Sequence, residues 1–426
     1  MKLKAVSLFS SSGIGDIALQ KLGFNVVLAN ELIESRANLF SENYPNTYMF
    51  KGDIWKLQDE MINFYKKKYS DDPFVILATP PCQGMSANGM GKMLSEYRKG
   101  LREKFDPRNQ LIIPTMKVIK ALQPEWVILE NVPNMQNTII LDENGKPKNI
   151  IEYIFETLND YVGESKVINF SSYGVAQDRK RLITILTKSN VGKTAFKKLG
   201  TFIPSPEYGQ NSLFLKQTKT LRDVIGDVPP LDASEGKNIR DDIHPLHKVP
   251  IMDKKKYTWV KYTKEGDSAF NNQCINPSCL FQNNKLHGTK ITDNINQAKK
   301  NTPLHCEKCG ELLPRPSVID SKSKEARIMS GFTSAYKRMS WDKPSPTLTK
   351  NLMYVSSDNK IHPSQNRTLS LYEALKIQTI LDYNYSFKIN GKYVNNQLIA
   401  ESIGESVPPK IIEVLLESII KISKNN

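Results

Sequence analysis

Short apolar runs alternate with helix-like segments through the first 190 residues, and this alternation constrains the fold more than any other feature. The apolar runs lie at residues 5–9, 26–29, 74–78, 126–129, 167–170 and 182–186. The helix-like segments between them lie at residues 33–43, 57–69, 110–122 and 150–159. Strands that alternate with helices predict a mostly parallel sheet covered on both faces, a doubly wound α/β fold. Because ligands of such sheets bind at the carboxyl ends of the strands, the residues that follow each run are candidates for a site.

The charge balance favours a polyanionic partner. The chain has 426 residues, with 59 Lys and Arg against 44 Asp and Glu and a formal net charge of +15. Basic side chains at phosphates release condensed counterions, which favours nucleic acid; a solvated basic surface without a partner is the alternative. No apolar run approaches the roughly 18–20 residues of a membrane span, so we expect no membrane partner and a cytoplasmic protein.

A turn of small residues follows the first apolar run and indicates a ligand site. It reads Phe9-Ser-Ser-Ser-Gly-Ile-Gly15, and it lets a ligand approach the backbone and the start of the next helix. Glu31 ends the second run, where an acid can accept hydrogen bonds from ribose hydroxyls. Asp53 follows a third predicted strand and can take an exocyclic amine. These residues suit a nucleoside-containing cofactor, with NAD among the candidates, although three serines disfavour a pyrophosphate. The alternative is that the glycines only serve a tight turn.

A lone cysteine and an acid follow two neighbouring apolar runs. Cys82 lies in Thr79-Pro-Pro-Cys-Gln-Gly84, where two prolines stiffen the turn, and Glu130 directly follows the run at 126–129. A cysteine at a strand end is a candidate nucleophile, and the acid beside it is a candidate proton donor. The alternatives are an inert buried cysteine and a helix-capping acid. The basic, glycine-punctuated segment 88–104 is a candidate lid over this site.

These motifs together resemble those of the cytosine-C5 DNA methyltransferases. Phe9–Gly15 resembles the family's cofactor loop, Pro80-Pro-Cys-Gln83 its nucleophile loop, and Glu130-Asn-Val132 its acid motif. Further along, the resemblance extends to Gln177-Asp-Arg-Lys-Arg181, to Arg367-Thr-Leu-Ser370 with Glu373 and Gln378, and to Gly404-Glu-Ser-Val-Pro-Pro409. Six motifs in the family's order cover the catalytic half almost completely.

The resemblance implies a covalent mechanism on a flipped cytosine. The thiolate of Cys82 would attack C6, C5 would take the methyl group of S-adenosyl-L-methionine, and loss of the C5 proton with elimination of the cysteine would restore the ring. Glu130 would hold N3 and the 4-amino group, while Arg179 and Arg181 would present donors at O2 and beside the cysteine. The catalytic set implied is Cys82, Gln83, Glu130, Asn131, Arg179 and Arg181.

The resemblance also implies a cofactor pocket. It places an aromatic ring at Phe9, a ribose acid at Glu31, adenine contacts at Asp53 and Ile54, and the methionine carboxylate at the backbone of the Ser10–Gly15 turn. The cofactor-binding set implied is Phe9, Ser10, Ser11, Ser12, Gly13, Gly15, Glu31, Leu32, Asp53, Ile54, Pro81, Ser406 and Val407. The chain departs from the family pattern at Ser11, at Leu32 and at Glu405, where glycine, an aromatic residue and asparagine are usual.

The other four cysteines form two pairs in the second half of the chain. Cys274 and Cys279 are separated by four residues, and Cys306 and Cys309 by two. Such spacing, with four soft thiolates, is typical of a structural zinc site; two disulfides are the alternative. Residues His287 and His305 flank the pairs and are substitute ligands.

A change in residue composition and apolar patterning divides the chain into segments. Residues 190–355 scatter proline, asparagine and lysine and lack long apolar runs, which predicts a looser second domain, and helical periodicity returns at 371–379 and 411–422. By the resemblance, 1–189 is the catalytic and cofactor domain, 190–355 the target-recognition domain, and 356–426 a return to the catalytic domain. The pair Thr347-Leu348 resembles the pair that marks the end of the recognition region. Zinc in that region is expected to organise a DNA-reading surface.

The sequence therefore predicts a sequence-specific, S-adenosylmethionine-dependent DNA cytosine-5 methyltransferase of a prokaryotic modification system. Its expected partner is double-stranded DNA, in the cytoplasm at the nucleoid, with the chain a monomer. One alternative is a cognate restriction endonuclease that acts on the same site without direct binding, and the other is an orphan modification enzyme without such a partner. A tRNA cytosine-5 methyltransferase on the same fold is the second hypothesis, and the zinc-bearing insert favours duplex DNA over it. The third is a catalytically dead DNA-binding relative, against which intact Cys82, Glu130, Arg179 and Arg181 argue.

Overall fold

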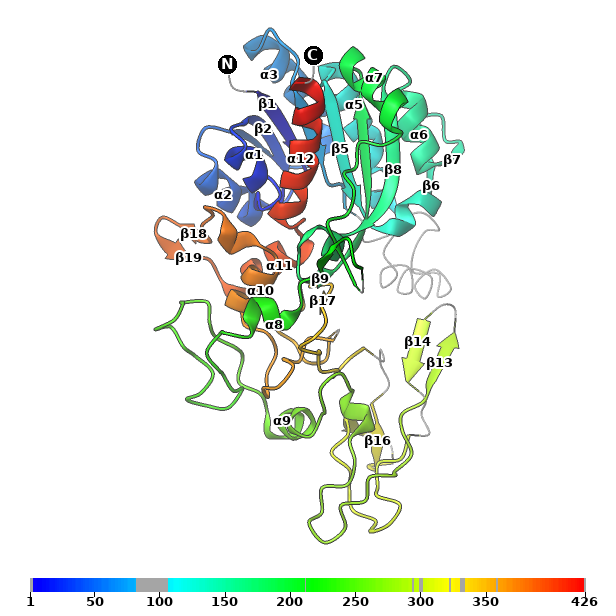
Figure 1. The fold of residues 1–426 in the computed structure, drawn as a ribbon, viewed down its shortest axis with the longest axis vertical. Coiled ribbons are helices and arrows are strands. Elements are labelled where there is room, and N and C mark those ends of the chain that lie inside the picture. The colour runs from blue at the N-terminus through cyan, green and yellow to red at the C-terminus, as the bar shows by residue number, and fades with distance from the viewer. Residues whose placement is uncertain are drawn as a thin grey trace.

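A twisted seven-stranded sheet forms the centre of the larger domain (Figure 1). The computed structural model describes residues 3–81, 106–210, 212–292, 295–298, 302–321, 323–329, 334–357 and 359–424. Cys82, Gln83 and the basic segment 88–104 therefore lie outside the described residues. The sheet consists, in spatial order, of β3 (Tyr48–Lys51), β2 (Asn25–Glu31), β1 (Lys4–Leu8), β4 (Val75–Ala78), β5 (Trp126–Asn131), β10 (Lys180–Thr187) and β8 (Val162–Asn169).

The first five strands of the sheet are parallel, and β10 runs antiparallel to both β5 and β8. The parallel strands are almost wholly apolar because helices cover both of their faces. The predicted α/β fold with a mostly parallel sheet is thus confirmed. The covering helices are α1 (Ile17–Lys21), α2 (Glu34–Asn43), α3 (Ile54–Lys68), α5 (Ile112–Leu122), α6 (Ile150–Thr157), α7 (Asn190–Leu199) and α12 (Pro409–Lys424).

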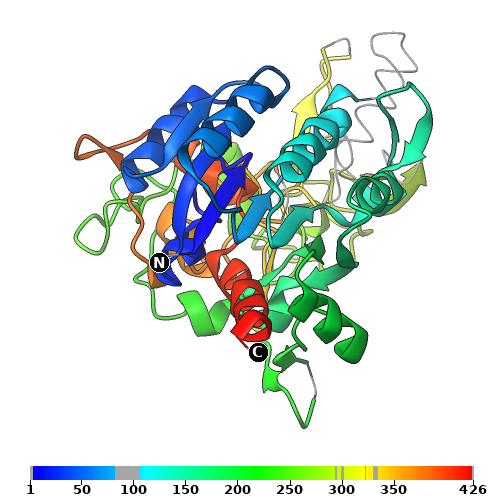
Figure 2. The same cartoon turned by 90° about the horizontal axis from the view of Figure 1, so that it is seen from above.

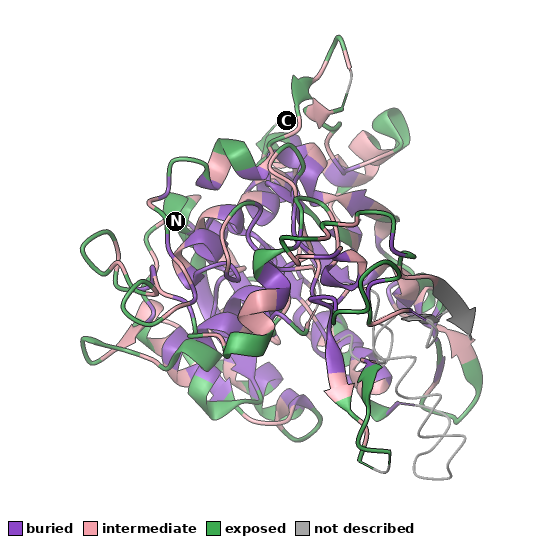
Figure 3. Ribbon diagram, turned by 90° about the horizontal axis from the view of Figure 1, so that it is seen from below, coloured by how far each residue is buried: buried purple, intermediate pink, exposed green. Residues whose placement is uncertain are grey.

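The sheet has one apolar core on each face. Helices α3, α5 and α6 fill one face, while α1, α7 and the C-terminal α12 fill the other, as the view from above shows (Figure 2). Trp126 on β5 is fully buried on the second face, where its ring meets Phe202 edge-on with 5.0 Å between centroids. Buried residues concentrate in the sheet and its covering helices (Figure 3). The last helix thus belongs to the same core as the first strand.

The apolar core of the larger domain includes residues beyond position 189. Helix α7 contacts α12, Phe202 and Ile203 join the core of the second sheet face, and Ser418 of α12 donates to the carbonyl of Phe202 at 2.9 Å. A third core then joins Ile14, Ile17 and Leu39 of the larger domain to segments between residues 221 and 403. It contains α8 (Leu221–Ile225), α10 (Leu371–Ile377), α11 (Asn396–Glu405) and Leu348.

The remaining part lies beyond β9 (Gln177–Asp178) and β17 (Ser345–Pro346), on the side away from the sheet (Figure 1). A small core around α9 (Lys254–Lys261) holds Trp259, Phe270 and Tyr336, and a separate cluster holds cysteines.

The chain also forms short strands outside the central sheet, in both parts of the molecule. They are β6 (Ile139–Leu141), β7 (Pro147–Asn149), β11 (Tyr208–Gly209), β12 (Lys216–Gln217), β13 (Thr289–Thr292), β14 (Ile295–Ala298), β15 (Ser317–Ile319), β16 (Ala326–Ile328), β18 (Lys388–Ile389) and β19 (Lys392–Tyr393).

Within the described residues, no helix is both long enough and apolar enough to cross a membrane.

Candidate active site

The carboxyl ends of β1, β4 and β5 bring the predicted cofactor, nucleophile and acid motifs together. Thr79, just after β4, donates from its amide to the carbonyl of Leu8 at 3.2 Å and from its hydroxyl to the carbonyl of Phe9 at 3.1 Å. On the other side, the Asn131 amide donates to the carbonyl of Pro80 at 3.1 Å. The turn of Pro80 and Pro81 is therefore fixed between the cofactor loop and the acid motif.

Glu130 forms an ion pair with Arg181 at this edge. Strand β10 runs antiparallel to β5, with Ile183 opposite Glu130, and this register brings Arg181 beside the acid. The Nε of Arg181 lies 2.9 Å from Oε1 of Glu130, and the two side chains are 14 % and 10 % exposed. The carboxyl group of Glu130 and the guanidinium of Arg181 thus adjoin the turn of Pro80 and Pro81. Such a pair can hold the polar edge of a base.

Arg179 is placed differently from Arg181. It is buried, and its guanidinium donates to the carbonyl of Leu348 at 3.0 Å and to the carbonyl of Gly404 at 3.2 and 3.3 Å. The sequence could not reveal these acceptors, because they lie about 170 and 225 positions further along the chain. Arg179 therefore ties the end of the recognition region to α11.

Two buried glutamines continue this connection. Gln177 accepts a hydrogen bond from the amide of Leu348 at 3.0 Å and donates to the side-chain oxygen of Gln378 at 2.7 Å. Gln378 in turn donates to the carbonyl of Ile403 at 2.7 Å, next to the hydroxyl of Ser406 at 3.4 Å. This chain of amides fixes the segment of Ser406 and Val407 against the larger domain.

The cofactor loop is held by Glu31 and by an unusual backbone. One carboxylate oxygen of Glu31 accepts from the amide of Ser11 at 2.9 Å and the other from the amide of Ile33 at 2.8 Å. Burial raises the pKa of Glu31 despite these donors. Gly13 has a φ of +85°, and a Cβ there would lie 2.4 Å from the Tyr44 ring. The loop therefore requires glycine at this position.

The residues that are expected to contact adenine, Asp53 and Ile54, follow the end of β3 and lie at the start of α3. Asp53 caps α3 by accepting from the amide of Trp55 at 3.0 Å, and Ile54 is buried behind it. Asn30 fixes the end of β3 by donating to the carbonyls of Phe50 and Gly52. Leu32, by contrast, is 67 % exposed.

A cleft joins the cofactor loop to the segment after α11. Its walls are Ser7, Leu8, Ser10, Ser11, Ile14, Gly15, Asp16, Leu77, Thr79, Glu405, Ser406 and Val407. Buried oxygens of Ser11, Ser12 and Asp16 have no hydrogen-bond partner among the described residues. Unpartnered hydroxyl and carboxyl oxygens, beside the acid Glu31 that is expected to bind ribose, fit a ligand with hydroxyl and ammonium groups. The residues thus suit S-adenosylmethionine.

Two residues of this region were missed by the sequence reasoning. Asp16 reads as a helix cap because it precedes α1, yet its side chain makes no capping bond. Arg36, on α2, pairs with Glu405 at 2.7 Å and with Glu401 at 3.4 Å. No local signal identifies Arg36, because both partners come from α11.

The four cysteines of the recognition region meet as predicted from their spacing. The sulfur atoms of Cys274, Cys279, Cys306 and Cys309 all lie within 4.8 Å of one another. The closest pairs are Cys274 with Cys309 at 3.6 Å and Cys279 with Cys306 at 3.9 Å, and all four are free thiols. His287 instead hydrogen-bonds Thr302 and stacks on Phe270, outside this group. The chemistry of four clustered thiols suits a tetrahedral metal ion.

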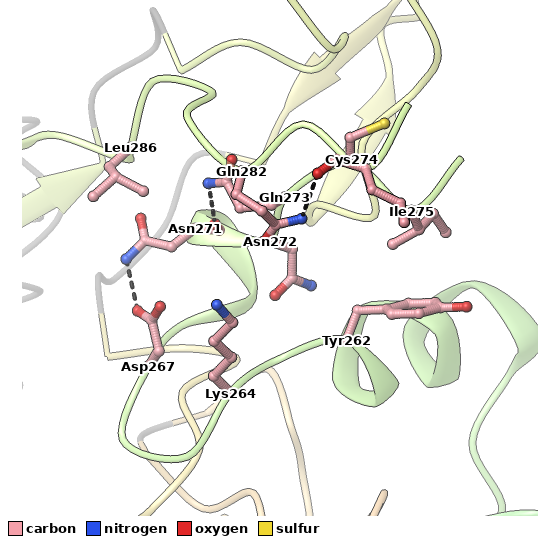
Figure 4. A pocket seen from close by; sticks show the side chains of 11 residues that line it. Tyr262, Lys264, Asp267, Asn271, Asn272, Gln273, Cys274, Ile275, Gln282 and Leu286 are labelled. Atoms are coloured by element: carbon pink, nitrogen blue, oxygen red, sulfur yellow. Dashed lines mark hydrogen bonds between the residues drawn. The ribbon is translucent and has the colours of Figure 1, made fainter. Parts of the chain in front are cut away.

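A cavity of about 390 Å³ adjoins Cys274 (Figure 4). Its lining combines amide side chains with an aromatic ring, a cation and two exposed leucines: Tyr262, Lys264, Asp267, Asn271, Asn272, Gln273, Cys274, Ile275, Leu280, Gln282 and Leu286. Asn271 is fixed by Asp267 at 2.7 Å, and Gln273 donates to the carbonyl of Asn271 at 2.8 Å. The amides are thus held in place on a polar surface.

The fold and this edge of the sheet define a methyltransferase with a nucleoside-containing methyl donor. The family model for C-5 cytosine-specific DNA methylases matches residues 3–421, and the chain belongs to that family. It is a cytosine-C5 DNA methyltransferase, its substrate is DNA, and the methyl donor of the family is S-adenosylmethionine.

Characterised relatives match nearly the whole chain. The type II methyltransferase M1.HgaI of Avibacterium volantium is 28 % identical over 98 % of both chains. The type II methyltransferase M1.HphI of Haemophilus parahaemolyticus is 24 % identical over all of this chain and 88 % of its own. A prophage-encoded DNA modification methyltransferase from E. coli has a TM-score of 0.58 at 18 % identity, and the Entamoeba histolytica methyltransferase EhMeth 0.53 at 14 %, each over the full length of both chains. The two structures support the fold.

Proposed function

We propose that this chain is the modification enzyme of a type II restriction-modification system, which methylates C5 of one cytosine within a specific duplex sequence. The relatives named as type II methyltransferases, matched over almost their full length, support this proposal. The enzyme acts as a monomer on nucleoid DNA in the cytoplasm. A cognate endonuclease cuts the same site without binding the methyltransferase.

The observation that carries the catalytic assignment is the Glu130–Arg181 pair beside the Pro80-Pro81 turn and the cofactor cleft. Cys82 follows Pro81 directly and adds to C6 of a flipped cytosine, so that C5 becomes nucleophilic. S-adenosylmethionine supplies the methyl group. The C5 proton is then lost and the bond between Cys82 and C6 breaks, which restores the aromatic ring. The Asn131 amide fixes the turn that precedes Cys82 by donating to the carbonyl of Pro80, and Gln83 is proposed as a further catalytic residue.

Glu130 and Arg181 act directly on the base. Glu130 holds N3 and the 4-amino group, and Arg181 keeps its carboxylate oriented while presenting donors at O2. Arg179 is a positioning residue, because its guanidinium donates to the carbonyls of Leu348 and Gly404. The direct contact of Arg179 with the base, which the family resemblance implies, stays a prediction.

Methyl transfer to defined nucleic acids tests the function. Incubation with labelled S-adenosylmethionine and either duplex DNA or tRNA should label the duplex alone, at 5-methylcytosine within one recurring sequence. Label in tRNA would instead support the second hypothesis. Once the sequence is mapped, a duplex with 5-fluorocytosine at the target should trap the enzyme covalently, because fluorine cannot leave as a proton does. Cys82→Ala should abolish both trapping and turnover while still binding cofactor; turnover by this variant would refute the covalent mechanism.

Glu130→Gln tests the role of the acid. Loss of a positioned proton donor should slow single-turnover methyl transfer by roughly 10²- to 10⁴-fold, with duplex affinity changed by less than about threefold. Glu156→Gln is the matched control, because Glu156 is an exposed acid of the same domain. If Glu130→Gln weakens DNA binding as much as chemistry, Glu130 is structural.

We also propose that Cys274, Cys279, Cys306 and Cys309 hold one structural zinc ion. Four sulfur atoms within 4.8 Å of one another, in a segment with a core of only a few residues, support this assignment. Purified protein should contain about one zinc per chain, and Cys306→Ser should lose it. Metal-free protein with full sequence-specific activity would refute the zinc site.

The recognition domain around this zinc is proposed to read the DNA. We propose that this domain has the bounds expected from the sequence, residues 190–355, which contain the cluster of four cysteines. The amide-lined cavity beside Cys274 is one surface for that contact. Lys264→Ala should weaken duplex binding and reduce its salt dependence, as expected when a phosphate contact is lost.

A further inference from the structure

A buried carboxyl group in the cofactor cleft has a role that the sequence motifs leave unexplained. Asp16 is 2 % exposed and lies in the wall of the cleft that also contains Ser10, Ser11 and Glu405. The Ser7 hydroxyl hydrogen-bonds the carboxyl group, but Oδ1 has no hydrogen-bond partner among the described residues. Because the side chain makes no capping bond to α1, helix capping does not explain it.

The groups packed around Asp16 supply no positive charge. Tyr44, directly after α2, faces it, but the phenol donates to the carbonyl of Gly13 at 2.6 Å. Tyr385 also faces it and donates to the carbonyl of Ser12 at 2.6 Å. Across the cleft, Glu405 is an acid paired with Arg36. No cationic side chain of the described chain forms an ion pair with Asp16.

A buried carboxyl group without a cationic partner, such as that of Asp16, favours the binding of a cationic ligand. Desolvation raises the pKa of Asp16 to about 7, even though the Ser7 hydroxyl and the backbone amide of Asp16 act in the opposite direction. A carboxylate inside a protein stays ionised when a cation with N–H donors faces it. An uncompensated charge in such a position is costly, so the free oxygen indicates a missing donor.

We propose that Asp16 binds the α-ammonium group of the methionine moiety of S-adenosylmethionine and so positions the methyl donor. This proposal rests on the methyltransferase function. The ammonium has N–H donors for Oδ1, whereas the sulfonium has none. The methionine carboxylate is expected at the backbone of the Ser10–Gly15 turn, and the ammonium is bonded to the neighbouring carbon. The adenosine end is expected near Glu31 and Asp53, at the ends of β2 and β3.

Equilibrium binding without DNA tests this role. The Asp16→Asn variant keeps the size of the side chain and removes its charge. It should bind S-adenosylmethionine and S-adenosylhomocysteine roughly 10- to 100-fold more weakly in calorimetry, because both contain the ammonium. Its affinity for 5′-methylthioadenosine, which lacks the amino-acid moiety, should stay unchanged. Asp59→Asn, at an exposed aspartate of the same domain, is the control and should leave all three affinities unchanged.

A pH series gives a second readout that a merely structural role would not move. Between about pH 5.5 and 7 the wild-type protein must lose a proton from Asp16 to bind the ammonium, so its affinity should fall by up to tenfold per unit as the pH decreases. Asp16→Asn should show a flat profile. The neighbours Tyr44 and Tyr385 have pKa values raised above their ordinary range by burial, and Glu405 is paired with Arg36, so they do not account for such a profile.

The outcomes separate the possibilities. Equal weakening for all three ligands means that Asp16 only supports the fold of the loop, and weakening for S-adenosylmethionine alone means that it faces the sulfonium; either result overturns the proposal. If the wild-type protein binds neither S-adenosylmethionine nor S-adenosylhomocysteine, the proposed function itself fails. Methyl transfer by the wild-type protein, with unchanged ligand affinities for Asp16→Asn, would refute the assignment of Asp16 alone.

Discussion

Replacement of Glu373 by glutamine should destabilise the protein far more than an ordinary surface substitution. Glu373 and Arg367 are both fully buried, and the guanidinium donates to the two carboxylate oxygens at 2.7 Å each. The carboxylate also accepts from the amide of Ser370 at 2.8 Å in the capping box that begins α10. The neutral amide would leave the charge of Arg367 uncompensated in the core.

The expected cost is about 4 kcal/mol. Removal of one partner of a buried ion pair costs about 3–5 kcal/mol, and a damaged helix cap adds up to about 1 kcal/mol. A total of this size is a large fraction of the roughly 5–15 kcal/mol that stabilises a typical domain. Because α10 ends at Ile377, directly before Gln378, whose amide fixes the segment of Ser406, we expect cofactor affinity to fall as well.

Denaturant unfolding at pH 7 measures the cost, with Glu156→Gln of the exposed Lys148–Glu156 pair as the control. That exposed pair should contribute little to the stability of the protein, because solvent screens its charges. The double variant Arg367→Met with Glu373→Gln should recover part of the loss, because no buried charge remains. The reasoning is refuted if Glu373→Gln costs no more than Glu156→Gln, or if the double variant is less stable than the sum of the two single changes predicts.

The same pair predicts a pH dependence of stability. Burial alone would raise the pKa of Glu373, but the charge and hydrogen bonds of Arg367 hold it at about 2. The folded pKa thus lies below the unfolded value of about 4.3. The stabilisation is therefore complete above pH 4.3 and is lost as the pH falls toward 2. The stability difference between the wild-type protein and Glu373→Gln should shrink over this range.

Three further changes test other contacts. A Cβ at Gly404 would lie 2.2 Å from the amide nitrogen of Lys350, so Gly404→Ala must shift backbone, cost about 1–3 kcal/mol in unfolding and weaken S-adenosylmethionine binding in calorimetry. Gln378→Leu removes the link between Gln177 and the segment of Ser406, and should cost about 1–3 kcal/mol by the same unfolding assay. Tyr44→Phe, which loses the bond to the Gly13 carbonyl, should cost about 1 kcal/mol, seen as a lower Tm. Unchanged stability in any of these variants would show that the corresponding contact does not form.

Much of the larger domain follows from the sequence because its signals are local. The apolar runs at residues 5–9, 26–29, 74–78 and 126–129 predict β1, β2, β4 and β5 to within a few residues. Parallel strands buried on both faces have to be apolar throughout, so each run is visible without knowledge of its partners. The motif residues stand directly after these runs, and the order of the runs already places them at one edge. Equally local is the spacing of the four cysteines, and their sulfur atoms meet.

The tertiary structure alone decided how distant segments complete the site. The sequence predicts the same kind of donor for Arg179 and Arg181, which lie in one motif. In the structure, the register of β10 places Arg181 beside Glu130. Arg179 instead donates to the carbonyls of Leu348 and Gly404. Asp16 precedes α1 in the sequence, and only the tertiary structure places its buried Oδ1, which has no hydrogen-bond partner among the described residues, in the wall of the cleft. A sequence pattern records which face of an element is apolar. Which carbonyl or charge meets a buried polar side chain depends on packing between segments hundreds of residues apart.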